Sequence, residues 1–344
     1  DLKDGIIRCV GDAGQRFDED ALRMLRAVRF AGQLGFEIDD NTRNAIVQRA
    51  DRLENISAER IRVELTKLLV AKEAGRLRDA YSTGMTRYFL PELDKAMVTE
   101  QKNPHHIYTV GEHSIHGIEI MNCFFEVTSD RKMYDKVPEK IMSTAKKIAK
   151  KMNKKQHTIL CMAMLLHDIA KPVVMTVDDD GTGHFYGHPQ ESEKMAKKIM
   201  RRLTFDNESI SKVCRLVKFH DYRIEDSNRA FRRAVSKIGA DIMDMLFLVE
   251  YADVLSQSDK MLEEKLSKIN SGVERFEYIT QNAQPLSIKE LALTGSDLIA
   301  AGVKPGPNMG EILKKMLDKV LDEPEANTKE NLLEYLKTMD EFSL

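Results

Sequence analysis

The run Ile159-Leu-Cys-Met-Ala-Met-Leu-Leu-His-Asp-Ile-Ala-Lys171 places His167 and Asp168 directly after eight consecutive apolar residues. An aspartate in such surroundings is costly to bury unless something binds its charge. Neutral imidazole and carboxylate together are a standard ligand set for a divalent metal. The run therefore predicts a buried element that ends in a pair of metal ligands.

More histidines and a second aspartate complete a metal shell elsewhere in the chain. The ordered set is His113, His167, Asp168, His188, His220 and Asp253. A two-metal site needs imidazoles and a carboxylate that can bridge the ions, and Asp168 is the natural bridge. One metal would be completed by His113, His167 and Asp253, and the second by His188 and His220. Occupancy by one metal instead of two fits the same residues.

A metal in this site would supply a nucleophile, because a bound divalent ion lowers the pKa of its water and gives hydroxide at neutral pH. The ligand set suits Mn²⁺, Ni²⁺, Fe²⁺ or Mg²⁺. Lys171 stands one helical turn after His167, where it could face a substrate phosphate. Asp168 and Lys171 are therefore the candidate catalytic residues of this site.

Five histidines lie outside the ordered set, namely His105, His106, His116, His157 and His184. A lone histidine on a helix is more often a hydrogen-bonded polar residue than a metal ligand. These five are interpreted as ordinary polar residues.

A second chemical pattern lies near the start of the chain. It consists of Glu19, Asp20, Arg23 and Arg26. Successive steps of about 100° along a helix place these side chains opposite the apolar side that holds Leu22, Leu25 and Val28. The pattern predicts a charged helix face that is open to a ligand.

Asp20 and Arg23 together offer a hydrogen-bond acceptor beside a donor. Cytosine and adenine each present an exocyclic amine next to a ring nitrogen acceptor, whereas uracil and guanine present the reverse order. The pair would therefore select C and A, because a wrong base leaves buried polar groups unpaired. The alternative is an ordinary helix salt bridge worth ~0.2–0.5 kcal/mol, and spacing alone favours that alternative.

Composition sets broad limits on the class of protein. The chain has 344 residues, 42% of them hydrophobic, and a net charge of −2, so any nucleic-acid surface must be a local patch. Its four cysteines are scattered without a C-x-x-C motif, which is typical of free thiols in a reducing compartment. No apolar run approaches the ~18 residues of a bilayer-spanning helix, and no signal peptide begins the chain. We expect a cytoplasmic protein without a membrane partner.

Sparse glycine and proline and long helical periodicity predict a mostly α protein. Several helices are expected over residues 18–95, among them Asn55–Leu69 with Ser57 as its N-cap. Pro91 and Pro104 predict a break near 91–105, followed by mostly helical sequence over 105–280.

Three local features interrupt or end this helical sequence. Val173–Val177 and Gly183–Tyr186 flank a turn and predict a β-hairpin. Lys146–Lys155 is expected to be a solvated, lysine-rich helix. A Gly/Pro loop over Gly302–Gly310 is expected to precede a last amphipathic helix.

The chain begins without methionine and runs at once into the strand-like Ile6-Ile-Arg-Cys-Val10. This start is typical of the end of a domain. We therefore expect further sequence upstream of Asp1.

The ordered metal set resembles the HD superfamily of metal-dependent phosphohydrolases, whose order is H…HD…H…H…D. His167-Asp-Ile-Ala-Lys-Pro172 is similar to the HDIGKP-like flank of that superfamily.

The remaining sequence resembles a different family. Arg16-Phe-Asp-Glu-Asp-Ala-Leu-Arg-Met-Leu-Arg-Ala-Val-Arg-Phe30, continued by Glu59-Arg-Ile-Arg-Val-Glu-Leu65, is similar to the neck of bacterial CCA-adding tRNA nucleotidyltransferases. The stretch from Asp297 to Leu313 and Pro324-x-x-Asn327 resemble the tail of that family. Some members carry an HD domain between neck and tail, so the resemblance covers nearly the whole chain.

The resemblance implies an organisation in four parts. Residues 1–15 would end a missing nucleotidyltransferase head, 16–95 would form a multi-helical neck, 96–280 an HD-type helical metal domain with a short β-hairpin, and 281–344 a helical tRNA-binding tail. It also implies template-independent addition of C, C and A to tRNA 3′ ends. Glu19, Asp20 and Arg23 would pair with incoming CTP and ATP, neck and tail would hold the tRNA, and Mg²⁺ in the head would activate the 3′-hydroxyl.

The sequence departs from the family at the polymerase carboxylates. The family's head carries a Gly-Ser motif followed by a D-x-D pair that binds the catalytic metals, and we find no such segment here. Asp178-Asp179-Asp180 has the D-x-D spacing but lies in the predicted hairpin turn, and Gly295-Ser-Asp297 lacks a partner carboxylate. The chain by itself is therefore not expected to polymerise nucleotides.

Two alternatives remain consistent with the residues. One is a stand-alone HD-domain phosphohydrolase that acts on a phosphomonoester or a cyclic phosphodiester. The other is a non-catalytic tRNA-binding module. Whether the full enzyme would add CCA, CC or only A depends partly on the head, and the oligomeric state is open.

Overall fold

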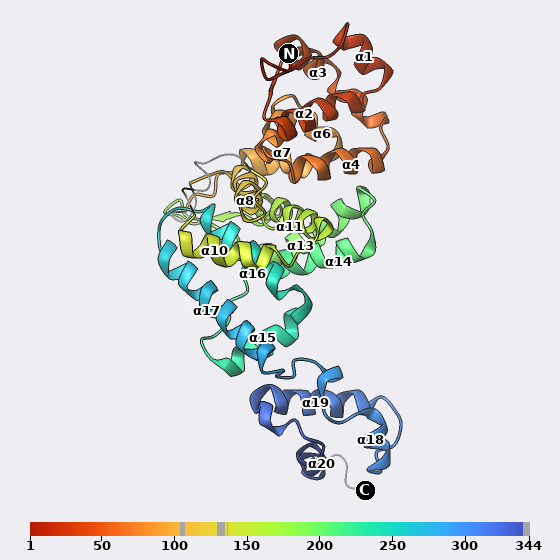
Figure 1. Ribbon diagram of the computed structural model, residues 1–344, viewed down its shortest axis with the longest axis vertical. Coiled ribbons are helices and arrows are strands. Elements are labelled where there is room, and N and C mark those ends of the chain that lie inside the picture. The colour runs from red at the N-terminus through yellow and green to blue at the C-terminus, as the bar shows by residue number, and fades with distance from the viewer. Residues whose placement is uncertain (104–106, 129–134, 136, 340–344) are drawn as a thin grey trace. The chain divides into compact units, whose positions relative to one another are not determined.

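The computed structural model describes residues 1–103, 107–128, 135 and 137–339. Figure 1 follows the chain from its N-terminus in red to its C-terminus in blue. The chain forms two compact units, the first made of Asp1–Tyr222 with Asp244–Ile269 and the second of Arg223–Met243 with Asn270–Leu344. Nearly all regular structure in the described residues is helical, as the sequence predicts.

The N-terminal part of the first unit consists of short helices. They are α1 (Ala13–Glu19), α2 (Leu22–Leu34), α3 (Asp40–Arg49), α4 (Ala58–Leu69), α5 (Leu77–Ser82), α6 (Thr86–Phe89) and α7 (Pro91–Val98). Helix α2 packs on α4, and α1 packs on α3. The predicted apolar side of α2 is confirmed, because Leu25 and Val28 are fully buried.

Two expectations for this part need correction. The strand at the start covers only β1 (Ile6–Ile7), which pairs in parallel with β2 (Glu37–Ile38). The break expected near 91–105 begins later than predicted, after α7 ends at Val98, because Pro91 begins that helix. Proline has no N–H to donate, and the first residue of a helix needs none, so proline fits this position well.

The helix expected over Asn55–Leu69 begins three residues later, at Ala58. Ser57 is its N-cap residue, as predicted, although its side chain makes no capping hydrogen bond. The preceding residues Ala50–Asn55 form a 3₁₀ helix.

The rest of the first unit surrounds helix α11. Its members are α8 (Val110–Phe124), α10 (Glu139–Ala149), α11 (Lys154–Leu166), α12 (Lys171–Val174), β3 (Thr176–Val177), β4 (Gly183–His184), α13 (His188–Arg202), α14 (Asn207–Phe219) and α16 (Met243–Leu255). Helix α11 packs against α4, α8 and α14. Every residue from Ile159 to Leu166 is at most 2% exposed, so the apolar run forms the centre of this unit.

The lysine-rich segment 146–155 was expected to form one helix. It contains instead the end of one helix and the start of the next. Helix α10 ends at Ala149, and Asn153 begins α11 with a capping box that it forms with Gln156. An asparagine followed by glutamine three residues later satisfies the first free N–H groups of a new helix, and this favours a break at that point.

The predicted β-hairpin is confirmed in a shorter form. Strands β3 and β4 pair antiparallel, with Thr176 opposite His184. The start of the predicted first strand, Val173 and Val174, belongs instead to helix α12.

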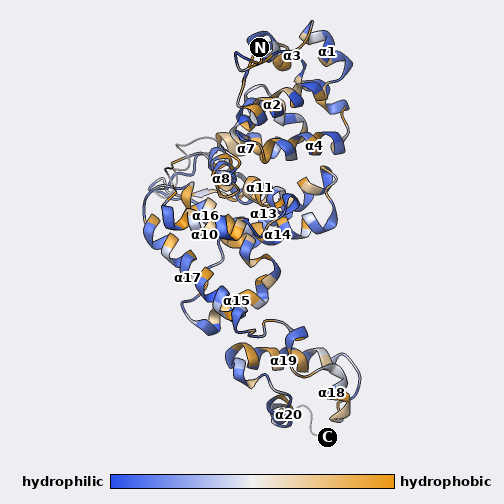
Figure 2. Ribbon diagram, viewed as in Figure 1, coloured by the Kyte–Doolittle hydropathy of each residue, from blue (hydrophilic) through white to orange (hydrophobic). Residues whose placement is uncertain are grey.

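The second unit contains α15 (Asn228–Ile238), most of α17 (Leu262–Gln281), α18 (Gly295–Ala300), α19 (Asn308–Asp322) and α20 (Lys329–Lys337). The amphipathic helix expected after the Gly/Pro loop is α19, and Figure 2 shows both hydrophobic and hydrophilic residues along it. Its apolar side forms a small core through Ile312, Met316 and Val320. Arg232 of α15 donates to the backbone oxygens of Leu321 and Asp322 at the end of α19.

One stretch of the described residues, Lys154–Val174, has the length and the mean hydropathy (1.3) of a membrane-spanning helix. Of its most apolar window, 78% is buried inside the protein, which is what the core helix of a globular unit shows. The stretch coincides with α11 and its continuation.

Candidate functional site

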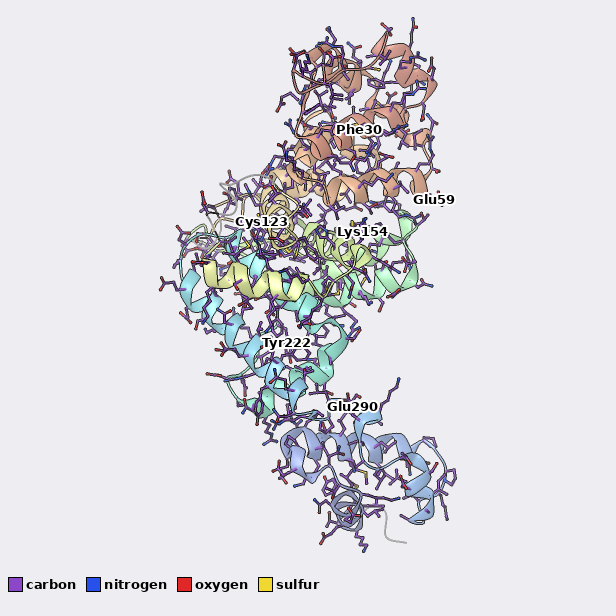
Figure 3. The ribbon with its side chains drawn as sticks, viewed as in Figure 1. Phe30, Glu59, Cys123, Lys154, Tyr222 and Glu290 are labelled. Carbon is purple, nitrogen blue, oxygen red and sulfur yellow. The ribbon has the colours of Figure 1, made fainter. Side chains whose placement is uncertain are left out.

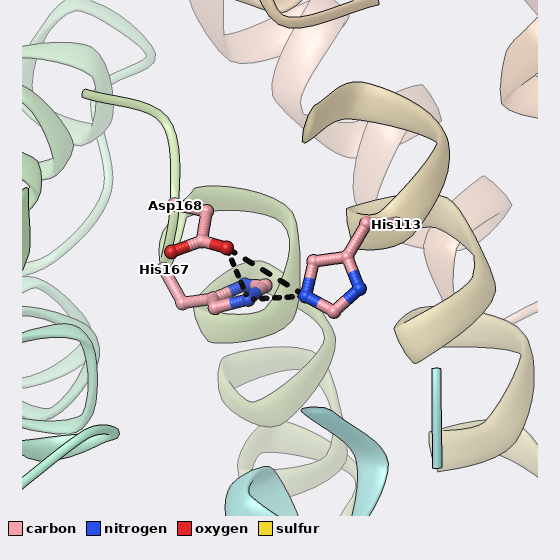
Figure 4. Close-up of side chains that lie close together, drawn as sticks. All are labelled: His113, His167 and Asp168. Carbon is pink, nitrogen blue, oxygen red and sulfur yellow. Dashed lines mark hydrogen bonds and ion pairs between the residues drawn. The ribbon is translucent and has the colours of Figure 1, made fainter. Parts of the chain in front are cut away.

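The six predicted metal ligands lie together in the first unit. His113 comes from the first turns of α8, His188 begins α13, and Asp253 lies on α16. His167 and His220 are the residues that directly follow α11 and α14, and Asp168 follows His167. Five separate helices thus bring their ligands to one point. Figure 4 shows three of these side chains, His113, His167 and Asp168, with their facing atoms joined by dashed lines.

Asp168 is the centre of this cluster. Its Oδ2 lies 3.3 Å from His167 Nε2 and 3.6 Å from His113 Nε2. Its Oδ1 lies 3.3 Å from His188 Nε2 and 3.6 Å from His220 Nε2. Each carboxylate oxygen therefore faces a different pair of imidazoles, which is the arrangement of a bridging ligand.

Asp253 completes the first of these two groups. Its Oδ1 lies 2.9 Å from His113 Nε2 and 3.5 Å from His167 Nε2. Both contacts are with the first pair of imidazoles, so the grouping follows the division that the sequence predicts.

All four imidazoles are oriented through their other ring nitrogen. The Nδ1 atoms of His167, His188 and His220 lie 2.7–2.9 Å from the backbone oxygens of the residues three positions earlier. His113 Nδ1 lies 3.3 Å from the backbone oxygen of Ser256. A carbonyl accepts only from an N–H, so each Nδ1 carries a proton, and in the neutral imidazole Nε2 then presents a lone pair. This tautomer is the one that metal-binding histidines adopt.

One buried atom in the cluster lacks a hydrogen-bond donor. Asp168 Oδ1 is a buried oxygen without any hydrogen-bond partner. A carboxylate oxygen is not left in this state unless a further group binds it. The unsatisfied oxygen, with imidazole Nε2 atoms around it, fits a divalent cation. Two groups of side chains lie close enough together to hold one, namely His113, His167 and Asp168, and Asp168, His188 and His220.

The electrostatics of the acids favour a positive charge at this point. Burial acts to raise the pKa of Asp168, but the neighbouring His167 and Lys171 lower it well below the usual range. Burial likewise acts to raise the pKa of Asp253. Hydrogen bonds with His113 and His167 outweigh this effect together with the charges of both rings, and they lower the pKa well below the usual range. Both carboxylates are therefore ionised ligands at neutral pH.

Lys171 does not occupy the position expected of a residue that meets a substrate. Its side chain is 6% exposed, and its Nζ lies 2.6 Å from Asp168 Oδ2 and 2.8 Å from Gln101 Oε1. The short helix α12 turns the lysine back toward the aspartate three residues earlier. Lys171 therefore neutralises the central carboxylate inside the protein and does not point to an open side.

Sequence reasoning missed two residues around Asp253 that belong to the site. Gln257 Nε2 donates to both oxygens of Asp253 at 3.1 Å, and Ser256 Oγ lies 3.1 Å from His113 Nδ1. The only signal in the sequence is their position three and four residues after Asp253, where one turn of helix brings side chains together.

The predicted nucleotide-binding residues were expected on one helix, but they do not share one. Helix α1 ends at Glu19, Asp20 has extended backbone angles, and α2 begins at Leu22. Asp20 accepts from the N–H of Leu22, a short side-chain bond that competes with helix continuation. The charged residues therefore lie at the junction of two helices.

The ion pairs at this junction also differ from the expected ones. Arg23 donates to Glu19 at 2.5 Å, and Asp20 accepts from Arg60 of α4 at 2.8 Å. Hydrogen bonds from Arg23 and Arg16 lower the pKa of Glu19. Burial acts to raise the pKa of Asp20, but the hydrogen bonds from Arg60 and from the N–H of Leu22, together with the charges of Arg60 and Arg23, lower that pKa. Asp20 and Arg23 are thus both charged, each with another partner.

A cavity of about 430 Å³ opens beside this junction. Arg16, Arg23 and Arg26 line it together with Phe30, which Figure 3 labels on α2. Arg26 and Arg29 lie over the Phe30 ring, which is 37% exposed. Three guanidinium groups and a partly exposed aromatic ring can hold a phosphate-bearing, planar ligand.

The histidines outside the metal set have ordinary polar partners where the structure describes them. His116 pairs with Glu119, His157 with Asn122, and His184 with Asp178. His105 and His106 lie outside the described residues.

Comparison with known proteins identifies relatives for two parts of the chain. Residues 35–97 match the family described as the RNA and SrmB-binding site of polymerase A. Residues 188–336 match the family described as tRNA nucleotidyltransferase domain 2.

Two curated relatives extend this result. A CCA-adding enzyme of Leuconostoc mesenteroides is 47% identical over 91 residues, which is 26% of this chain and 23% of that enzyme. An A-adding tRNA nucleotidyltransferase of Deinococcus radiodurans is 27% identical over 333 residues, which is 92% of this chain and 68% of that enzyme. The matched stretch thus spans about a quarter of the first relative and about two thirds of the second.

Solved structures show the same fold. The CCA-adding enzyme of Bacillus stearothermophilus in complex with CTP has a TM-score of 0.58 and 21% identity, covering 97% of this chain and 65% of that one. The Thermotoga maritima CCA-adding enzyme complexed with tRNA has a TM-score of 0.52 and 19% identity, covering 99% of this chain and 66% of that one. The helical arrangement of this chain is therefore that of the corresponding part of these enzymes.

Proposed function

We propose that this chain belongs to the family of bacterial CCA-adding tRNA nucleotidyltransferases, and that it supplies nucleotide selection and tRNA binding to an enzyme that adds C, C and A to tRNA 3′ ends. The observation that carries this proposal is the arginine-lined cavity at the α1–α2 junction, next to Glu19, Asp20 and Arg23. The relatives' structures were solved with CTP and with tRNA, which are the ligands we propose for this chain. As a tRNA-processing protein it would act in the cytoplasm.

The cavity suits an incoming nucleoside triphosphate. Arg16 and Arg26 would bind its phosphates, since guanidinium groups donate to phosphate oxygens in pairs. The ionised Asp20 would accept from the exocyclic amine of cytosine or adenine, while Arg23 would donate to the adjacent ring nitrogen. To do so both side chains exchange their present partners, Arg60 and Glu19, for the base.

A test of this proposal uses the enzyme in the form that carries its polymerase carboxylates. It is incubated with labelled tRNA that ends before CCA, and with tRNA that ends in CC, each with CTP, ATP or both. Growth by three nucleotides on the first substrate supports CCA addition. Growth only of the CC-ending tRNA, with ATP alone, would replace the proposal with A addition, the activity in the name of the Deinococcus relative.

We also propose that the histidine–aspartate cluster is a divalent metal centre with phosphohydrolase chemistry. The unsatisfied Asp168 Oδ1 among imidazole Nε2 atoms supports this proposal. His113, His167 and Asp253 would hold one ion and His188 and His220 another, with Asp168 shared between them. Such an ion supplies a nucleophilic hydroxide at neutral pH. Mn²⁺, Ni²⁺, Fe²⁺ and Mg²⁺ are the candidates.

The chain's own residues prepare this centre for a phosphoester. Nδ1–H bonds to backbone oxygens fix the four imidazoles, so no reorganisation is needed for binding. Lys171 holds Asp168 and balances part of its charge. The apolar run of α11 excludes water from the inner side.

Two measurements test the metal centre. Calorimetric titration with Mn²⁺ and with Ni²⁺ is expected to show binding by the chain, and Asp168→Asn is expected to abolish it. Hydrolysis of p-nitrophenyl phosphate is expected only with metal. His184→Asn, a change at an exposed histidine outside the set, is the matched control. Equal metal binding by Asp168→Asn and the control would refute the proposed ligand set.

A further inference from the structure

The ligands of the proposed metal centre differ in their exposure to solvent. Among its ligands, His113, His167, Asp168 and His220 have side chains at most 3% exposed. The side chains of His188 and Asp253 are 13% and 15% exposed. These two residues are the most exposed of the set, so we expect a phosphoester to reach the centre past one of them.

A lysine is linked to Asp253, the more exposed of these two ligands. Gln257, which lies two residues beyond the end of α16, donates to both oxygens of Asp253 through Nε2. Its Oε1 accepts from Nζ of Lys265 at 2.7 Å. The amide thus joins the most exposed ligand of the centre to the ammonium group of a lysine on α17.

The ammonium group of Lys265 is not neutralised by direct contact with an acid. Among the described residues, no carboxylate lies within ion-pair distance of Lys265, and its hydrogen bond is to a neutral amide. Asp253 and Asp221 lie near enough to attract it electrostatically. Its neighbour Lys268, by contrast, pairs with Glu264 at 2.6 Å and has a side chain 74% exposed.

Lys171, the other lysine of the centre, cannot serve a substrate in its present position. It is enclosed between Asp168 and Gln101. A dianionic phosphate at the metals requires charge-assisted donors in addition to the ions, and Lys265 is a half-buried cation beside the entrance.

We propose that Lys265 binds the phosphate group of a phosphomonoester at the mouth of the metal centre, and that Gln257 positions it. This inference rests on the proposed phosphohydrolase function of the cluster. On substrate entry, Nζ of Lys265 turns from the amide oxygen to a phosphate oxygen that points away from the metals. Gln257 keeps Asp253 fixed through its Nε2 atom. Lys265 therefore contributes to substrate binding and leaves metal binding to the histidines and aspartates.

The test compares Lys265→Gln with Lys268→Gln, which removes the same charge from the same helix three residues away. Mn²⁺ affinity, measured by calorimetry without substrate, is expected to be unchanged in both variants. With Mn²⁺ present, the Kd of inorganic phosphate is expected to rise about tenfold in Lys265→Gln and to stay constant in Lys268→Gln, since one charged hydrogen bond is lost. Lys265→Arg is expected to restore most of the affinity.

Kinetics give a second readout. The KM for p-nitrophenyl phosphate is expected to rise in Lys265→Gln with a much smaller change in kcat, and the monoanionic bis(p-nitrophenyl) phosphate is expected to be affected less. Equal phosphate affinities of Lys265→Gln and Lys268→Gln, with intact Mn²⁺ binding, would overturn the assignment of Lys265 alone. Absence of Mn²⁺ binding by the unaltered chain would overturn both the metal centre and this assignment.

Discussion

Asp20 Oδ2 accepts a hydrogen bond of 2.8 Å from Arg60 Nη2, which joins the break between α1 and α2 to the first turn of α4. Asp20 and Arg60 are 40 residues apart in the sequence. Arg60, and not the nearby Arg23, nevertheless holds the Asp20 carboxylate, which we propose recognises the base. The selectivity of the site therefore depends on how α4 packs against α2.

Replacement of Asp20 by alanine is expected to relax base selectivity. In the enzyme that carries its polymerase carboxylates, discrimination of CTP and ATP against UTP and GTP should fall by roughly one to two orders of magnitude, because the acceptor for the exocyclic amine is lost. The measurement is kcat/KM for each nucleotide. Asp18→Ala is the control, since Asp18 is a comparable exposed acid of α1 that pairs with Arg49. Unchanged discrimination in Asp20→Ala would show that Asp20 does not select the base and serves only in a structural salt bridge.

The buried ion pair between Arg29 and Glu64 is expected to be important for stability. Both side chains are 8% exposed, and the pair joins α2 to α4. Glu64→Ala should lower the free energy of unfolding by about 3–5 kcal/mol, because it leaves a buried guanidinium without its acid. Urea unfolding followed by circular dichroism measures this. Glu59→Ala, on the exposed first turn of α4 and labelled in Figure 3, is expected to change it by less than about 0.5 kcal/mol.

Stability of the first unit is expected to fall between about pH 6.5 and pH 4 through His157. Burial lowers the pKa of His157 to about 4. Because the unfolded chain takes up a proton near pH 6.5 and the folded chain does not, the contribution is fully present above that pH and is lost as pH falls toward 4. The loss is on the order of 3 kcal/mol.

The variant His157→Gln isolates this effect. Asn122 donates to the backbone oxygens of Leu69 and Ala71, so its Oδ1 accepts from His157 Nε2 at 2.8 Å. Glutamine can donate to the same oxygen but does not titrate in this range. Urea unfolding at pH 7 and pH 5 should show a smaller difference for the variant than for the unaltered chain. Equal differences would assign the pH dependence to other groups.

Removal of metal is expected to destabilise the first unit. A ligand that binds only the folded state stabilises it, by about 2.7 kcal/mol at a concentration one hundred times its Kd. Chelation should therefore lower the Tm of the chain by several degrees, and added Mn²⁺ should restore it. Asp168→Asn should be insensitive to both treatments. An unaltered chain whose Tm does not respond to chelator or Mn²⁺ would contradict the metal centre.

Residues 1–344 by themselves are expected to bind tRNA without extending it. The sequence contains no Gly-Ser segment followed by a D-x-D pair, and phosphoryl transfer to a 3′-hydroxyl needs carboxylates that hold the catalytic ions. Gel-shift and extension assays on one preparation separate the two properties. Extension by this chain alone would show that it holds another set of polymerase carboxylates.

The sequence by itself determined the helical class, the central position of the apolar run, the ordered set of six candidate metal ligands and the charged motif at residues 19–26. These features are read from local periodicity and residue chemistry, which do not depend on distant contacts. The hairpin and the last amphipathic helix were also predicted. Helix ends were predicted less well, because capping by residues such as Asn153 and Pro91 depends on one or two side chains.

Only the tertiary structure decided which charged groups meet. Arg60 reaches Asp20, Lys171 turns inward to Asp168, and Lys265 approaches Asp253 through Gln257. Periodicity states which side of a helix is buried but not which helix covers it. The partner of a charged side chain depends on how helices far apart in the chain pack together, and that packing follows from the burial of apolar surface over the whole unit.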